Sequence, residues 1–312
     1  MSLEENYVLS VVVGTFNRLD RLRECIESIL HDRSIPIMVY VTDAGSTDGT
    51  IDYLREIASE RINVTLHQQK LGQAKAYNEI FAKISTPYVC WLSDDNTVCN
   101  RGLEKAVRIL DANPRIGMVA LKVKDVQGPF SGEAYVGGIS EAGILNVNQG
   151  VLRTGILRGL GGFSEEFMDY GIDPDLTTRV LYSGHDIVYT KAVAILHSRD
   201  WGESNVLRSQ MAKQERYKAM YRERYCQGEG QSPVSQFSFR VAGAIKRVLA
   251  KMSWLLGARA KSWARDWYNI ILGRYISLFD PIRSAGKEFH LLQRCHPDTV
   301  GYHANRPRQE VR

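Results

Sequence analysis

The fold of this chain is decided by one short stretch, YVCWLSDDN at residues 88–96. An apolar run bounded by polar residues is typical of a strand that is covered on both faces. Two adjacent carboxylates, Asp94 and Asp95, follow where that strand should end. Open α/β sheets bind ligands beyond the carboxyl ends of their strands, so we expect a ligand site here. The alternative is that Asp95 or a polar neighbour caps a helix that begins near Arg101.

Strand and helix patterns alternate four times in the first third of the chain. Apolar runs predict strands at 8–13, 37–42, 62–66 and 88–92, and apolar residues at helical spacing follow each of them. This alternation predicts an α/β fold with a mostly parallel, doubly wound, Rossmann-like sheet. The first turn has neither a Gly-x-Gly-x-x-Gly pattern nor a lysine, which excludes the dinucleotide fingerprint and the P-loop.

Polar residues at the strand ends and helix starts are the candidates for binding. Asp43 closes the second predicted strand, where its carboxylate could accept a hydrogen bond from the imide of a pyrimidine base. It could equally stabilise its own loop as an Asx-turn. Gly72 opens the third predicted helix and Lys75 lies in its first half, where phosphate binds favourably. The alternative for Lys75 is a solvated surface side chain.

Four segments carry a resemblance to a known family. They are VVVGTFNR at 11–18, DAGSTDGT at 43–50, GQAKAYN at 72–78 and LSDDN at 92–96. In order and spacing they resemble the nucleotide-binding half of the family 2 glycosyltransferases of the GT-A fold, and the resemblance covers roughly residues 7–202. It implies that a nucleotide-sugar donor is held by Thr15, Asn17, Arg18, Asp43, Gly72, Lys75 and Asp94.

The resemblance also implies a divalent metal ion. In such enzymes the second acid of the pair and a histidine beyond the catalytic helix hold the ion against the diphosphate. Here these positions are Asp95 and His197, which follows a predicted strand at 193–196. We therefore expect Mn²⁺ or Mg²⁺ as cofactor. Without the resemblance, a single histidine would be interpreted as an ordinary surface or capped side chain.

The segment DYGIDPDLTTRV at 169–180 resembles the family's base-bearing helix. The resemblance implies that Asp173 is the general base, since inversion at an anomeric carbon needs a carboxylate that takes the acceptor's proton. Ile172 stands where the family often has Glu, and Pro174 follows the proposed base. We expect Asp175 to be structural, either as a charge in the first helical turn or paired with Arg179.

The second half of the resembling region is rich in glycine. Residues 128–143 predict a loop or hairpin, and 160–167 resemble the family's acceptor-side segment, LGGFSEEF. Glycines there could let the backbone approach sugars, or could serve turn geometry alone. Sugar, linkage and acceptor are not determined by these residues.

Charge divides the chain unevenly. The net charge is +5, yet residues 240–312 contain 14 Lys/Arg and 5 Asp/Glu, so that region carries +9 and the remainder −4. We expect a catalytic domain at 1–204 and a basic, amphipathic, helical extension at 205–312. Tyr217, Tyr221 and Tyr225 form a stripe that should pack on the catalytic domain.

Basic residues alternate with tryptophans at 240–275. This pattern suits a helix lying on an anionic membrane surface, and equally a helical hairpin packed on the domain or on a second subunit of a homo-oligomer. No nucleic-acid-binding module accompanies it, so we expect no nucleic-acid partner.

Cysteine usage and hydropathy bear on the compartment. The five cysteines are widely spaced without a Cys-x-x-Cys pair, which indicates neither a disulfide framework nor a zinc site. We recognise no signal peptide before Val8 and no apolar run of about 18–20 residues. The expectation is a cytoplasmic protein, with the extension able to bring it to the inner face of the membrane.

These observations lead to one functional prediction with two alternatives. The resemblance implies an inverting, metal-dependent glycosyltransferase of the bacterial cell-surface polysaccharide type. It would move sugar from a UDP- or dTDP-sugar to a glycan or lipid-linked saccharide. Ile172 and Pro174 motivate the first alternative, a catalytically inactive glycan-binding or scaffold subunit. A sugar nucleotidyltransferase is the second, but the glycine-rich basic loop near its amino terminus is missing.

Overall fold

A computed structural model of the protein describes residues 6–31, 34–127, 131, 134–138, 140, 144, 146–199, 204–225 and 289–293. Its strands are β1 (Leu9–Thr15), β2 (Ile37–Asp43), β3 (Ile62–Leu66), β4 (Tyr88–Ser93), β5 (Asn96–Val98), β6 (Ile116–Asp125), β7 (Ala134–Tyr135), β8 (Gly150–Arg153), β9 (Asp186–His197) and β10 (Phe289–Gln293). Its helices are α1 (Leu19–His31), α2 (Thr50–Ile57), α3 (Gln73–Phe81), α4 (Gly102–Ala112), α5 (Thr154–Gly159), α6 (Ile172–Tyr182) and α7 (Ser204–Tyr225), and a 3-10 turn lies at Glu165–Phe167.

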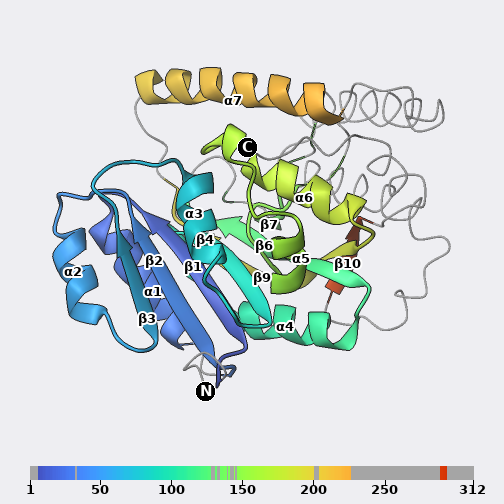
Figure 1. Ribbon diagram of the computed structural model, residues 1–312, viewed down its shortest axis with the longest axis horizontal. Helices are drawn as coiled ribbons and strands as arrows, with labels where there is room; N and C mark the ends of the chain where they lie inside the picture. Colours follow the sequence, from blue (N-terminus) through green and yellow to red (C-terminus); the bar gives the residue numbers. More distant parts are fainter. Residues whose placement is uncertain are drawn as a thin grey trace.

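A single mixed sheet forms the centre of the molecule (Figure 1). Its strand order is β10-β9-β6-β8-β4-β1-β2-β3, with β5 paired to β9 and β7 paired to β6. Strands β3, β2, β1 and β4 are mutually parallel, and so are β6 and β9, whereas β8 runs antiparallel between β4 and β6. The predicted α/β fold with a mostly parallel sheet is therefore confirmed.

Alternating side chains along the inner strands build two apolar cores, one on each face of the sheet. In β1, Val11 and Val13 enter one core and Val12 enters the other, and all three are fully buried. In β4, Cys90 and Trp91 divide between the cores in the same way. Burial on both faces explains why these strands are continuous apolar runs in the sequence.

Tyr77 of α3 joins the two central strands at their carboxyl ends. Its hydroxyl accepts a hydrogen bond from the Gly14 N–H at 2.8 Å and donates to the Leu92 carbonyl at 2.5 Å. The ring lies so close to β1 that a Cβ on Gly14 would be 2.7 Å from Tyr77 Cε2. Glycine at position 14 is therefore required by this close approach.

Two local expectations are resolved by the strand pattern. The helix-cap alternative for Asp95 is wrong, because β5 separates the acidic pair from α4, whose amino end at Arg101 has no side-chain cap. The strand expected at 193–196 is the second half of one longer strand, β9, which begins at Asp186. Its register against β6 shifts around Lys122, so a bulge absorbs the polar residues between the two apolar runs.

The extension is not separate from the first domain in the part that the structure describes. Tyr217, Tyr221 and Tyr225 of α7 are buried in the core that contains Trp91, as the tyrosine stripe predicts. The expectation that the extension is helical throughout is wrong at Phe289–Gln293, because these residues form β10 at the edge of the sheet against β9. Helical periodicity is a local signal, and it does not show which sheet a distant segment will join.

Residues 240–275, the proposed membrane-binding segment, lie outside the described residues. Among the helices that the structure does describe, none combines the length and the apolar character needed to cross a bilayer.

Removing the Tyr77 hydroxyl should destabilise the fold without leaving a large cavity. In Tyr77→Phe the Gly14 N–H and the Leu92 carbonyl lose their common partner inside the protein, which should cost about 1–3 kcal/mol. Chemical denaturation measures this free energy of unfolding. Tyr53→Phe, at a partly exposed tyrosine, is the matched control and should change stability by less than about 0.5 kcal/mol. Equal stability of the two variants would contradict the role given to Tyr77.

Candidate active site

Three parallel strands bring the predicted donor-binding residues to one edge of the sheet. Thr15 is the last residue of β1, Asp43 is the last residue of β2, and Asp94 with Asp95 follows β4. Both acids of the pair are buried, Asp94 at 4% and Asp95 at 8% exposure. Buried carboxylates need partners, and the neighbouring elements supply them.

Arg18 joins the acidic pair to the loop after β1. One guanidinium nitrogen lies 3.1 Å from Asp94 Oδ1 and 3.1 Å from Asp95 Oδ2. The Thr15 hydroxyl donates to Asp94 Oδ2 at 2.9 Å. Arg18 thus bridges both carboxylates, while its side chain stays 37% exposed and can be reached by a ligand.

His197 lies on the other side of Asp95 because of strand register. The antiparallel pair β5 and β9 sets His197 opposite Asn96, and β6 sets Asp125 beside it. His197 Nε2 is 3.5 Å from Asp95 Oδ1, and its Nδ1 is 2.9 Å from Asp125 Oδ1. The Tyr135 hydroxyl donates to the same Asp125 oxygen at 2.7 Å. The imidazole is therefore held between two carboxylates, with Nε2 directed to Asp95.

The pKa values of Asp94, Asp95 and His197 are shifted in different directions. Burial raises the pKa of Asp94 above its ordinary value, and Arg18 only partly opposes this effect. Burial would also raise the pKa of Asp95, but His197 and Arg18 outweigh it and lower that pKa. For His197, burial would lower the pKa, yet Asp95 and Asp125 raise it. Asp95 is thus held as an anion.

Asp43 stabilises its own loop, which is one of the two roles that the sequence allows. Its Oδ2 accepts from the backbone N–H groups of Gly45 and Ser46 at 2.8 and 2.9 Å, and its Oδ1 accepts from the Ser46 hydroxyl. The residue is fully buried. Asn17 joins the same loop, with its N–H donating to Ser46 Oγ and its Oδ1 accepting from the Thr47 N–H. Both residues shape this loop through an Asx-turn network.

The amino end of α3 is occupied by another part of the protein. Gln73 N–H donates to Asp169 Oδ1 at 2.8 Å, and Ala74 N–H donates to the Met168 carbonyl at 2.8 Å. Gly72 begins this helix with a φ of 87°, and Lys75 is exposed. Two N–H groups of this helix end thus already have acceptors, from a loop about a hundred residues away in the sequence, and donor binding by Gly72 and Lys75 stays a prediction.

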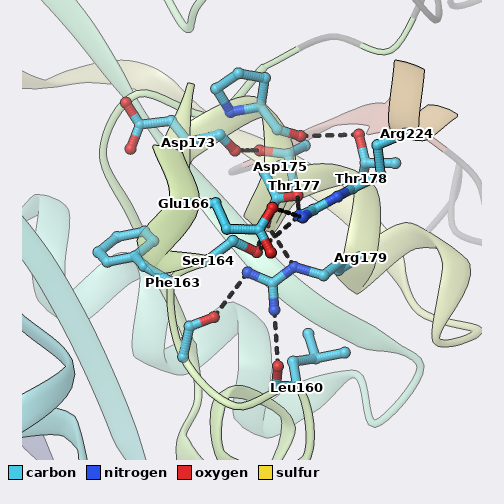
Figure 2. A network of polar contacts seen from close by, with 12 residues as sticks. Leu160, Phe163, Ser164, Glu166, Asp173, Asp175, Thr177, Thr178, Arg179 and Arg224 are labelled. Carbon is cyan, nitrogen blue, oxygen red and sulfur yellow. Dashed lines mark hydrogen bonds and ion pairs between the residues drawn. The ribbon is translucent and has the colours of Figure 1, made fainter. Parts of the chain in front are cut away.

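Asp173 and Asp175 begin α6 and point in different directions (Figure 2). Asp173 Oδ1 accepts from Trp91 Nε1 at 3.2 Å, so the proposed base is joined to β4, the strand that carries the acidic pair. The residue keeps some accessible surface although protein atoms surround its carboxyl group. Burial raises the pKa of Asp173 to about 7, against a smaller opposite effect of Trp91.

Asp175 is the centre of a buried ionic network (Figure 2). Arg179 Nε lies 2.7 Å from Asp175 Oδ2, which confirms the expected pair one helical turn apart. Arg224 of α7 lies 2.9 Å from Oδ1, and the Ser164 and Tyr225 hydroxyls also donate to this carboxylate. Burial would raise the pKa of Asp175, but Arg179 and the other donors outweigh it and lower that pKa. With this many donors, Asp175 is structural.

Three residues of this site were not predicted from the sequence. The sequence pattern places Trp91 only in a buried strand and gives no role to Asp125 or Tyr135. Asp125 had a signal, because it closes a strand as Asp43 does. The partner of Trp91 and the approach of Tyr135 to His197 depend on tertiary contacts between residues 82 and 62 positions apart.

Comparison with known sequences finds a family model that matches part of the chain. Residues 10–135 match the family model described as glycosyl transferase family 2. The putative teichuronic acid biosynthesis glycosyltransferase TuaG of Bacillus subtilis is 33% identical over 107 residues, which are 33% of this chain and 42% of TuaG. The uncharacterized glycosyltransferase alr2836 of Nostoc is 27% identical over 114 residues, which are 36% of this chain and 35% of alr2836. The chain thus spans less than half the length of these curated relatives.

Solved structures share the fold. The mannosyltransferase PcManGT from Pyrobaculum calidifontis, in complex with GDP-Man and Mn²⁺, aligns over 88% of both chains with a TM-score of 0.58 and 21% identity. S. aureus TarS 1-349, in complex with UDP-GlcNAc, aligns over 63% of this chain and 60% of its own with a TM-score of 0.51 and 18% identity. These likenesses support the GT-A fold.

Neutralising Asp175 should destabilise the protein strongly. Asp175→Asn keeps the shape of the side chain but leaves two partly buried guanidinium groups without their counter-charge, at a cost of about 3–5 kcal/mol. Because folding lowers the pKa of Asp175, its stabilisation exists at neutral pH and is lost as the pH falls through the folded-state pKa.

Denaturant unfolding of the wild type and of Asp175→Asn at neutral and acidic pH measures their free energies of unfolding. The difference in stability should shrink on acidification. Asp52→Asn is the control, because Asp52 belongs to an exposed pair with Arg55 and should have little effect at any pH. A stable Asp175→Asn variant would show that the network is not needed for folding.

Proposed function

We infer that this chain, a member of glycosyl transferase family 2 through its residues 10–135, is an inverting glycosyltransferase. It would move a sugar from a nucleotide-diphosphate donor to a hydroxyl group of a glycan or lipid-linked saccharide. One observation carries the proposal: of the carboxyl groups joined to β4, that of Asp95, directly after the strand, has a lowered pKa, and that of Asp173, hydrogen-bonded to Trp91, has a pKa raised to about 7. Carboxyl groups of one site whose environments push their pKa values apart are typical of a binding role for one and a base role for the other.

The residues present fit a divalent metal ion. Asp95 Oδ1 and His197 Nε2 are 3.5 Å apart. Two such ligands of one small divalent ion lie about 3.0–3.5 Å from each other. In the described part of the chain no group of three or more acidic, histidine or cysteine side chains surrounds one point. Mn²⁺ and Mg²⁺ accept such a site, because substrate phosphate oxygens and water complete their coordination.

The position of Asp125 behind His197 also suits a metal-binding histidine. A histidine that binds a metal through one ring nitrogen usually donates from the other to a carboxylate. His197 has this arrangement, with Nδ1 on Asp125 and Nε2 toward Asp95. When bound, the ion would stabilise negative charge on the departing diphosphate.

Asp173 would act on the acceptor. Its carboxylate removes the proton of the acceptor hydroxyl while that oxygen forms a bond to the anomeric carbon of the donor. The bond from this carbon to the diphosphate oxygen breaks, and the nucleoside diphosphate leaves with the bonding electrons from the opposite face. The configuration at the carbon is inverted. The Trp91 indole orients the carboxylate, because its N–H donates to one of the two oxygens.

The donor would bind along the ends of β1, β2 and β4. Asp94 is held by Thr15 and Arg18 and would contact the ribose or sugar. The Asx-turn loop of Asp43 would form one wall for the base. Since similar proteins bind GDP-Man and UDP-GlcNAc, both guanine and uracil diphosphates belong in a donor screen.

Neither sequence departure disturbs the base. Ile172 is buried in the core under α6, where its side chain contributes packing. Pro174 lies in the first turn of α6, where a backbone N–H has no acceptor within the helix. These placements favour an active transferase over a scaffold subunit.

Donor binding should depend on the metal and on Asp95. In calorimetric titrations of UDP, dTDP and GDP, one diphosphate should bind in the presence of Mn²⁺ and bind much more weakly in EDTA. Asp95→Ala should abolish the increase in diphosphate affinity that Mn²⁺ gives. Asp125→Asn should weaken Mn²⁺ binding by about 10–100-fold, as loss of a carboxylate behind a metal-bound histidine does.

Asp52→Ala, at an exposed acid of α2 that pairs with Arg55, should bind like the wild type. Failure of every diphosphate to bind a folded wild-type protein would reject the transferase proposal and favour the scaffold alternative.

The rate should follow the protonation of Asp173. Since its pKa is raised to about 7 and the base must be deprotonated, kcat/KM should rise as the pH increases through about 7 and fall below it. Asp173→Asn should lower kcat by about 10²–10⁴-fold while donor affinity is kept. Initial rates of nucleoside diphosphate release across pH measure both effects. An active Asp173→Asn enzyme would mean that another group is the base.

A further inference from the structure

Two residues at the end of α7, Arg224 and Tyr225, hold Asp175 at the start of α6 (Figure 2 shows Arg224 in this network). We propose that they are positioning residues for the base Asp173, acting through Asp175. This inference rests on the proposed function, because it needs Asp173 to be the base. It assigns a catalytic task to the helix that begins the extension, beyond the residues that match the family model.

Both carboxylate oxygens of Asp175 have a full set of hydrogen-bond donors. Oδ2 accepts from Arg179 at 2.7 Å and from Ser164 at 2.6 Å, both close in the sequence. Oδ1 accepts from Arg224 at 2.9 Å and from Tyr225 at 2.6 Å, both about 50 residues later. The residue is fully buried. Each oxygen therefore has two donors, and one oxygen is held entirely by α7.

Helix α7 also contacts α6 and the residues just before it at further points. The Tyr221 hydroxyl lies 2.5 Å from Thr178 Oγ1, one turn beyond Asp175. The Tyr217 ring packs 6.3 Å from the ring of Phe167, measured between centroids. At Gly171, directly before α6, a Cβ would be 3.3 Å from the Tyr217 Cβ. The first turn of α6 is thus fitted against α7 without spare volume.

The contact between α6 and α7 also determines the position of the proposed base, Asp173. Asp173 and Asp175 belong to the same turn of α6, and their carboxylates point apart (Figure 2). In the part of the chain that the structure describes, Trp91 is the one side-chain donor that reaches the Asp173 carboxylate. A carboxylate with a single side-chain bond is placed mainly by its backbone. The anchoring of Asp175 therefore decides where Asp173 lies.

The electrostatics agree with this assignment. Burial and the Asp175 charge raise the pKa of Tyr225, so its hydroxyl stays a proton donor at all physiological pH values. Arg224 extends from the buried Asp175 to Glu166, whose side chain is 70% exposed. Its guanidinium also lies 5.1 Å above the Phe167 ring. Arg224 is therefore fixed at both ends and cannot leave Asp175 without breaking an outer contact.

The test compares kinetic constants of conservative variants in the full chain. Tyr225→Phe removes one donor to Asp175 and keeps the ring. Its kcat should fall about tenfold, because small misplacements of a catalytic group carry rate losses of this order or more. KM for the donor should change by less than about twofold, since donor contacts are untouched. Arg224→Lys should retain more activity than Arg224→Met, because it keeps a cation near Asp175.

The pH profile separates positioning from general loss of structure. If the first turn of α6 moves outward, Asp173 becomes less buried and its pKa falls from about 7 toward an ordinary carboxyl value. The acidic limb of the kcat profile should then move to lower pH in Tyr225→Phe. A variant that was only partly unfolded would lose amplitude without this shift. Thermal melting checks the folded fraction.

Matched controls lie on the same helix. Tyr217→Phe keeps the packed ring, and Glu215→Gln alters an exposed pair with Lys218. Both should keep the kcat and the pH midpoint of the wild type.

The possible outcomes distinguish the two proposals. This inference alone would be overturned if the wild type is active, Asp173→Asn is inactive, and Tyr225→Phe keeps the kcat and the pH midpoint of the wild type. An inactive wild type or an active Asp173→Asn would overturn the proposed function and this inference with it. A lower kcat in Tyr225→Phe with the pH midpoint of the wild type would assign Tyr225 to stability only.

Discussion

Buried negative charge at the end of β4 is the constraint on which the rest of the site depends. Asp94, Asp95 and Asp125 lie in one small region with almost no exposure. Carboxylates cannot be taken out of water unless cations or donors reach them. Arg18 comes from the first loop and His197 from the end of the last long strand of the domain, so the ends of the domain must meet at its centre. The order β9-β6-β8-β4-β1 makes that meeting possible.

Asp175 and Asp173, the two acids of α6, differ in how many hydrogen-bond donors their buried carboxyl groups receive. Asp175 receives four donors, two of them arginines, and has no oxygen left for a substrate. Burial raises the pKa of Asp173 to about 7, and among the described side chains Trp91 is the one donor that opposes this shift. A fully satisfied carboxylate stabilises structure, whereas a poorly satisfied one in an accessible place can exchange a proton. In the proposed reaction, Asp175 would thus stabilise the turn of α6 from which Asp173 would act as the base.

The proposed reaction draws on both halves of the described chain. The segment that matches the family model contains the ends of β1, β2 and β4, which would bind the donor. The base, the histidine and the helix α7 lie beyond it in the sequence. Trp91 and Asp125 connect the halves, because one reaches Asp173 and the other reaches His197. Donor binding and acid–base chemistry are therefore joined through the sheet.

The sequence by itself determined the alternation of strands and helices, the acidic pair after β4 and the Asp175–Arg179 pair. These features depend on periodicity and on neighbours in the chain, which a linear pattern contains. Tertiary structure alone decided that Asp169 occupies the start of α3 and that Asp125 holds His197. It also added β10 to the edge of the sheet against β9, which the local pattern of the extension does not predict. The physical reason is that a buried polar group takes whichever partner the packing brings near, and here those partners are 72 and 96 residues away in the sequence.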